Sequence, residues 1–138
     1  MKCAELMNPP EACQPQDSLQ QLLAALQRDN IGSIPIVDSF QNWRPMGVVT
    51  DRDAALFLGR TDRRVSEVAC REVMTTPVIS CEETDDVKDA VELMRQHKLR
   101  RILVTNQGKL TGIISQADLA RQKSGVAKKL VEDVSQAA

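Results

Sequence analysis

Two seven-residue segments of this 138-residue chain carry the same order of residue types. Residues 47–53 and 112–118 each contain a glycine, two β-branched residues, a hydroxyl residue, two variable residues and an aspartate. The β-branched pair favours a buried strand. The hydroxyl residue, with an acid three residues later, favours the capped first turn of a helix. Each segment therefore predicts a strand that runs directly into a helix.

The same residue types could also bind a phosphate and a ribose. Exposed amides and a hydroxyl at a helix start can hold phosphate oxygens. A carboxylate can accept hydrogen bonds from both ribose hydroxyls without a metal ion. Helix capping alone would explain one copy, whereas two copies in register point to a paired ligand site. Thr50 and Asp53, with Ser115 and Asp118, are the first candidate ligand-binding residues.

The repetition extends beyond these motifs to most of the chain. Residues 72–77 echo residues 5–10 at an offset of 67. An apolar helical stripe at Leu19, Leu22, Leu23 and Leu26 recurs 68 positions later at Val87, Ala90, Val91 and Met94. Strands are expected at residues 11–13, 34–37, 46–49, 78–81, 101–105 and 110–114. Helices are expected to begin near residues 18, 50, 86 and 115, so each half reads β-α-β-β-α.

This pattern predicts an α+β fold made of two repeats. The expected boundaries are a first repeat at 1–59, a linker at 60–71, a second repeat at 72–122 and a C-terminal helix at 123–138. A half of this size has too little core to be stable alone, so each half is expected to cover an apolar face of the other.

Composition narrows the possible functions. A net charge of −1 and a pI near 5.8 argue against a dedicated nucleic-acid binder. No apolar run approaches the roughly 20 residues of a membrane helix, and no secretory signal is evident, so a cytoplasmic protein with no membrane partner is expected. The spacing of the four cysteines and the single His97 match no zinc motif, so no metal site is expected. Because no export signal is evident, reduced thiols are expected, with a disulfide as the open alternative. No nucleophile–base pair is evident, so no catalytic residue and no enzymatic activity are expected.

Together these features resemble a CBS-domain pair, or Bateman module, of the stand-alone bacterial type. The matching segments are 33–38, 73–75, the helix that runs to Gln96 and His97, and the two motifs at 47–53 and 112–118. The resemblance covers roughly residues 3–122. It implies tandem repeats packed through their sheets about a pseudo-twofold axis, with two clefts between them. It also implies a homodimer.

The resemblance further implies a regulatory sensor of adenosine-containing ligands: AMP, ADP, ATP, S-adenosylmethionine or NADH. The adenine nucleotide would be a regulatory ligand, and no cofactor would be required. The signal would pass through an effector protein or through dimer geometry. The alternative is a ligand-free structural module for dimerisation, in which both motifs are only helix starts. Weak nucleic-acid binding is a third interpretation, disfavoured by the acidic pI.

Carried onto this chain, the resemblance assigns specific residues to each cleft. The first would contain Thr50 and Asp53 with Thr76, Pro77, Val78, Ile79, Leu99, Arg100 and Arg101. The second would contain Ser115 and Asp118 with Asn8, Pro10, Glu11, Ile31, Gly32 and Ser33. Because arginine can pair bidentately with phosphate, the first cleft is predicted to be the better phosphate site.

Overall fold

The computed structural model describes residues 1–121, which divide into two compact units. Unit 1 contains Met1–Pro10 together with the chain from Ile79 onward, and unit 2 contains Glu11–Val78. Each unit is described by itself below. The helix expected at 123–138 lies outside the described residues.

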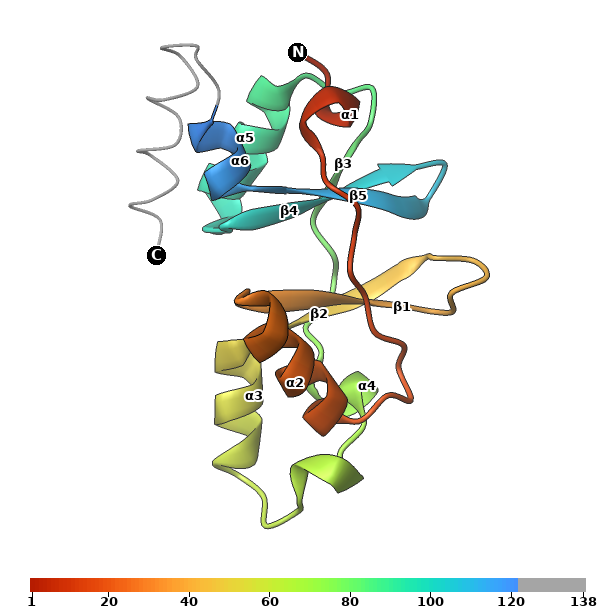
Figure 1. Ribbon diagram of the computed structural model, residues 1–138, viewed down its shortest axis with the longest axis vertical. Helices are drawn as coiled ribbons and strands as arrows, with labels where there is room; N and C mark the ends of the chain where they lie inside the picture. The colour runs from red at the N-terminus through yellow and green to blue at the C-terminus, as the bar shows by residue number, and fades with distance from the viewer. Residues whose placement is uncertain (122–138) are drawn as a thin grey trace. The chain divides into compact units, whose positions relative to one another are not determined.

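Unit 2 is a two-stranded antiparallel sheet with helices on one face (Figure 1). Its elements are α2 (Leu19–Asp29), β1 (Ser33–Val37), β2 (Pro45–Thr50), α3 (Asp51–Leu58), the 3-10 helix η1 (Val65–Glu67) and α4 (Cys70–Val73). Helix α2 packs on β1, and α3 and α4 pack on β2. The motif at 47–53 therefore spans the junction between β2 and α3, as predicted.

Unit 1 has a three-stranded sheet, again with its helices on one face (Figure 1). Its elements are α1 (Cys3–Leu6), β3 (Ser80–Glu82), α5 (Val87–His97), β4 (Arg101–Asn106), β5 (Lys109–Ser115) and α6 (Gln116–Ala120). Strand β3 pairs with β4 in parallel, and β4 pairs with β5 in antiparallel fashion. The motif at 112–118 spans the junction between β5 and α6.

The two predicted apolar stripes form the centres of the two cores. In α2, Leu19 and Leu22 are fully buried, and in α5, Ala90 and Met94 are fully buried. Both helices begin as the sequence predicts, with Ser18 capping α2 through a 3.1 Å hydrogen bond from the Gln21 amide. The helical periodicity in the sequence therefore identified both cores.

The strand expected at residues 11–13 is reduced to a single bridge between Cys13 and Ile36. In the equivalent ladder of unit 1, the Glu83 amide donates to the Thr105 carbonyl at 3.0 Å. The residue equivalent to Glu83 is Pro15, 68 positions earlier, which has no amide hydrogen to donate. The loss of this hydrogen bond explains why the first repeat has one strand fewer than predicted.

The first segment of the chain packs in unit 1, away from the rest of its own sequence repeat. The Cys3 amide donates to the Asp85 carbonyl at 2.8 Å, and the Asn8 amide donates to the Ile113 carbonyl at 2.9 Å. Residues 72–78, which open the second sequence repeat, belong correspondingly to unit 2. The compact units therefore break at different points from the sequence repeats, whose boundaries remain a prediction.

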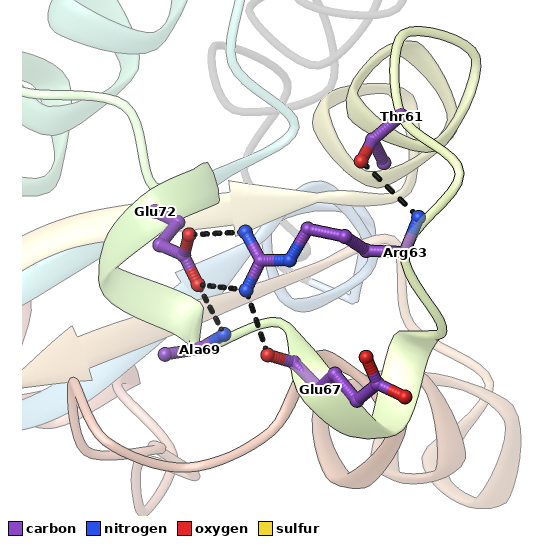
Figure 2. Close-up of polar contacts among 5 residues, drawn as sticks. All are labelled: Thr61, Arg63, Glu67, Ala69 and Glu72. Atoms are coloured by element: carbon purple, nitrogen blue, oxygen red, sulfur yellow. Dashed lines mark hydrogen bonds and ion pairs between the residues drawn. The ribbon is translucent and has the colours of Figure 1, made fainter.

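The charged connection at 60–71 is packed within unit 2 rather than extended into solvent. Val68 is 1% exposed, and its carbonyl accepts a 2.8 Å hydrogen bond from the Leu19 amide. Figure 2 shows both terminal nitrogens of the Arg63 guanidinium donating hydrogen bonds to residues of this connection and of α4. Arg63 donates to the two Glu72 carboxylate oxygens at 2.6 and 3.1 Å, and to the Glu67 carbonyl at 2.8 Å.

This contact predicts an acid-sensitive contribution to stability. The Arg63 guanidinium, followed by the Ala69 amide, lowers the pKa of Glu72 to about 2. A group whose folded-state pKa is depressed stabilises the fold above its unfolded pKa and loses that contribution as the pH falls. The Glu72→Gln variant should therefore be less stable than the parent at pH 6, and the difference should shrink as the pH falls from about 4.5 towards 2. Urea unfolding across this range measures it.

Glu67→Gln is the matched control, because its carboxylate makes only a 3.8 Å ion pair with the exposed Arg64. Surface pairs of this kind contribute little. A Glu72→Gln difference that stays constant down to pH 2.5 would contradict the assigned role of the carboxylate.

Candidate functional site

In unit 2 the motif at 47–53 forms a reciprocal cap at the start of α3. The Asp53 amide donates to Thr50 Oγ1 at 3.0 Å, and the Thr50 amide donates to Asp53 Oδ2 at 3.0 Å. The cap fixes both side chains at the end of β2. The helix-start interpretation is therefore confirmed for this copy, and it leaves the other carboxylate oxygen of Asp53 for a second partner.

That second partner is Thr75, which is not among the site residues predicted from the sequence. Thr75 Oγ1 donates to Asp53 Oδ1 at 3.2 Å. The backbone of Thr75 is held by Val48, with hydrogen bonds of 2.8 and 3.1 Å in the two directions. The predicted site residues Thr76, Pro77 and Val78 follow directly, within the same unit. The structure thus brings the start of the predicted 76–79 segment to the Asp53 carboxylate.

In unit 1 the second motif repeats this arrangement. The Asp118 amide donates to Ser115 Oγ at 3.1 Å, and the Ser115 amide donates to Asp118 Oδ2 at 2.7 Å. Asn8, 67 positions before Thr75, donates from Nδ2 to Asp118 Oδ1 at 2.7 Å. Asn8 and Pro10 lie in this unit, so the structure brings the predicted Asn8–Asp118 pair together.

The two aspartates nevertheless differ in their surroundings. Asp118 is 4% exposed, and its Oδ1 also forms an ion pair with the Arg121 guanidinium. The residue equivalent to Arg121 at the 65-residue offset is Leu56, which is 54% exposed and uncharged. Asp53 is only partly buried, and among residues 1–121 no cation pairs with its carboxylate. Asp118 is therefore neutralised locally, and Asp53 is not.

Each motif glycine is required by the segment that crosses it. A Cβ on Gly47 would lie 2.9 Å from Met74 Sδ and 3.0 Å from the Thr75 carbonyl oxygen. A Cβ on Gly112 would lie 2.7 Å from Met7 Cβ and in overlap with Met7 Sδ. Met74 and Met7, which directly precede Thr75 and Asn8, therefore pack against Gly47 and Gly112. The two methionines are 67 positions apart, and this repeat was the signal in the sequence for the contact.

The residues at the starts of β1 and β4 lie beside the motif of their own unit. In unit 2, the Gly32 carbonyl accepts from the Asp51 amide at 3.0 Å, and Ser33 pairs with Thr50 across β1 and β2. Ile31 directly precedes them, and Glu11 belongs to the same unit.

In unit 1, the Arg100 carbonyl accepts from the Gln116 amide at 2.9 Å, and Arg101 pairs with Ser115 across β4 and β5. Leu99 directly precedes them, and Ile79 belongs to the same unit. The structure therefore places both arginines next to the Ser115 motif. Their predicted action with Thr50 and Asp53 concerns residues of two units and stays a prediction.

The part of the chain that the structure describes was also compared with the requirements of a metal site and of a membrane-spanning helix. Within residues 1–121, no group of three or more His, Cys, Asp or Glu side chains is placed to hold a metal ion. His97 ends α5 in an exposed position. All four cysteines are buried and free. None of the helices in this range has the length and apolar character needed to cross a bilayer.

Comparisons with known proteins agree with the repeat structure. The family model "CBS domain" matches twice, at residues 3–60 and 70–125. The "Uncharacterized protein YlbB" of Bacillus subtilis is 33% identical over 126 residues, which cover 90% of this chain and 84% of that protein. The "CBS domain-containing protein YhcV" of Bacillus subtilis is 34% identical over 108 residues, covering 77% of this chain and 73% of that protein.

Longer proteins match only in part. The chain is 30% identical over 117 residues to the "Inosine-5'-monophosphate dehydrogenase" of Halobacterium salinarum, covering 83% of this chain but 22% of that enzyme.

Solved structures show the same fold. The CBS domain protein PAE2072 from Pyrobaculum aerophilum, complexed with AMP, has a TM-score of 0.76 at 24% identity, covering 99% of both chains. The CBS domain pair of protein MJ0100, in complex with 5-methylthioadenosine and S-adenosyl-L-methionine, has a TM-score of 0.74 at 23% identity, covering 88% of this chain and 94% of that one. Two family matches that cover most of the chain, together with relatives of similar length, identify the protein: it belongs to the CBS-domain family and carries a tandem pair of CBS repeats.

Proposed function

We propose that this protein is a regulatory module that binds an adenosine-containing ligand, with Asp53 as the ribose-binding carboxylate of the main site. The observation that carries the proposal is the Asp53 carboxylate itself, which is fixed by the Thr50 cap and has no cationic partner among residues 1–121. PAE2072 is described in complex with AMP, which supports the ligand class.

The contacts of Asp53 suit exchange with ribose hydroxyls. Its Oδ1 accepts a single long hydrogen bond, 3.2 Å, from the exposed Thr75 hydroxyl. A hydroxyl–carboxylate bond of this length costs little to replace, because water or ligand can satisfy both partners. A ribose with two adjacent hydroxyls would regain both hydrogen bonds at once.

The phosphate contacts can be supplied by the start of α3. This helix has eight residues, and its Thr50 hydroxyl and first-turn amides lie beside Asp53. The positive end of a helix favours anionic oxygens. AMP, ADP, ATP and S-adenosylmethionine share the adenosine part, so the choice among them depends on the group attached to the ribose 5′ carbon.

We infer a weaker role for the Ser115 and Asp118 motif. A ribose there would have to replace the short bond from Asn8 and compete with the Arg121 guanidinium. Breaking charge-assisted contacts costs more than exchanging a hydroxyl.

The output of the module is proposed to run through an effector protein or through the geometry of a homodimer, as the family resemblance implies. The binding proposal does not depend on this route. The competing function is a ligand-free interaction module, for which the helix caps alone explain both motifs.

A thermal-unfolding panel with AMP, ADP, ATP, S-adenosylmethionine and NADH distinguishes the two functions. A ligand present at about 100 times its dissociation constant should add roughly 2.7 kcal/mol to the free energy of unfolding. Guanosine nucleotides at the same concentrations are the control for nonspecific anion effects. If none of the five ligands raises the midpoint above this control, the binding proposal is wrong and the interaction module is preferred.

A further inference from the structure

Each unit buries one pair of cysteines that come from distant parts of the chain. Cys3 of α1 lies with Cys81 of β3 in the core of unit 1, and Cys13 lies with Cys70 of α4 in the core of unit 2. All four are thiols and are at most 8% exposed. Cys70 follows Cys3 by 67 positions and Cys81 follows Cys13 by 68, so the internal duplication relates one pair to the other.

In unit 1 the two sulfurs are in direct contact. Cys81 Sγ lies 3.6 Å from Cys3 Sγ and 3.7 Å from the Leu103 carbonyl oxygen. A disulfide requires a separation of about 2.05 Å, so the sulfurs would have to approach by roughly 1.5 Å. The hydrogen bond from Cys81 lowers the pKa of the Cys3 thiol and raises that of Cys81.

In unit 2 the equivalent pair is held by its backbone. The Cys13 amide donates to the Pro35 carbonyl at 3.0 Å, and the Cys70 amide donates to the Asp17 carbonyl at 2.8 Å. The two side chains pack in one buried cluster, and Cys70 Sγ donates to the Ser18 carbonyl at 3.7 Å. The neighbouring thiol lowers the pKa of Cys13 and raises the pKa of Cys70. Both units therefore bury two thiols in one core at the same pair of equivalent positions.

We propose that Cys3 with Cys81, and Cys13 with Cys70, are two dithiol oxidation sites that a peroxide converts to intramolecular disulfides. In each pair one thiolate attacks the peroxide oxygen, which forms a sulfenic acid and releases water. The partner thiol then displaces the second oxygen as water, and the S–S bond forms. Two S–H bonds and the O–O bond are broken, and two electrons pass from the sulfurs to the peroxide.

The position of the pairs gives the oxidation a structural consequence. Cys3 lies five residues before Asn8, and Cys70 lies five residues before Thr75. A disulfide in each unit would tie down the segment that brings Asn8 to Asp118 or Thr75 to Asp53. An effect on nucleotide binding rests on the proposed function, whereas the oxidation itself is independent of it.

Mass spectrometry of the intact protein tests the oxidation. The folded chain is treated with hydrogen peroxide, remaining thiols are alkylated, and the mass and the cross-linked peptides are determined. We expect two disulfides and a loss of about 2 Da for each. Peptide mapping should join Cys3 to Cys81 and Cys13 to Cys70, and a reductant should restore four alkylatable thiols.

The Cys81→Ala and Cys70→Ala variants separate the two sites, because each should retain the disulfide of the other unit. Mapping of the unsubstituted chain keeps the test valid if either variant folds poorly. Crossed pairs such as Cys3 with Cys13, disulfides between molecules, or only sulfinic acid products would overturn the proposal. So would four thiols that stay unmodified until the protein unfolds.

Discussion

The Asp53→Asn variant is expected to bind AMP roughly 10 to 100 times more weakly than the parent, because it replaces a charged acceptor of ribose hydrogen bonds by a neutral one. Asparagine retains an oxygen that can accept the Thr50 amide, which donates to Asp53 at 3.0 Å, so the helix cap survives. The change therefore tests binding with little change in the fold. Isothermal titration calorimetry of both proteins gives the ratio of dissociation constants.

Asp118→Asn is the matched control at the equivalent position of the other motif. Its carboxylate is already occupied by Asn8 and Arg121, so the substitution should change AMP affinity by less than threefold, about 0.6 kcal/mol. Unfolding curves of both variants separate a binding effect from a folding effect. If Asp118→Asn loses binding while Asp53→Asn keeps it, the main site has been assigned to the wrong motif.

Gly112→Ala is expected to destabilise the protein by about 1 to 3 kcal/mol, the usual range for added volume in a packed site. The new methyl group would lie 2.7 Å from Met7 Cβ, an atom next to the backbone that cannot rotate away. The segment that carries Asn8 must therefore shift. Urea unfolding at neutral pH measures the loss.

Gly59→Ala is the control for this substitution. Gly59 has a φ of −70°, and the nearest atom to an added Cβ would be the Ala55 carbonyl oxygen at 3.5 Å. With ordinary backbone geometry and no overlap, alanine there should change stability by no more than about 0.5 kcal/mol. Equal losses in the two variants would show that the Met7 contact is not the reason for a glycine at 112.

Most of the fold could be predicted from the sequence, because its cores are built from local periodic patterns. The Leu19 and Leu22 stripe and the Ser18 cap define α2 without any long-range information. The placement of the first ten residues could not be predicted in this way. Their pattern predicts a short helical turn. Nothing in the local sequence indicates that the Cys3 amide will donate a hydrogen bond to the Asp85 carbonyl rather than to a residue nearby.

The candidate site could be predicted in outline. The repeated hydroxyl and aspartate identify the two capped helix starts, since capping depends on residues only three positions apart. Thr75 escaped prediction because its contact with Asp53, 22 positions earlier, depends on tertiary placement. Arg121 lies only three positions after Asp118, so this ion pair follows from local helical spacing and could have been predicted from the sequence.

The arginines and the carboxylates give separate reasons for preferring the Thr50 and Asp53 motif. Arg100 and Arg101 lie beside Ser115 in the strand register of unit 1, and their action with Thr50 and Asp53 stays a prediction. Within the units, the carboxylates differ: Asp118 is 4% exposed and paired with Arg121, whereas Asp53 has a replaceable hydroxyl partner.

A crystal structure of the protein grown with AMP would show directly whether Asp53 binds the ribose. We expect nucleotide density in which both ribose hydroxyls donate to the Asp53 carboxylate, with the phosphate at the Thr50 end of α3. Density with the ribose on Asp118 and none at Asp53, or no bound nucleotide at a concentration that saturates related CBS pairs, would contradict it.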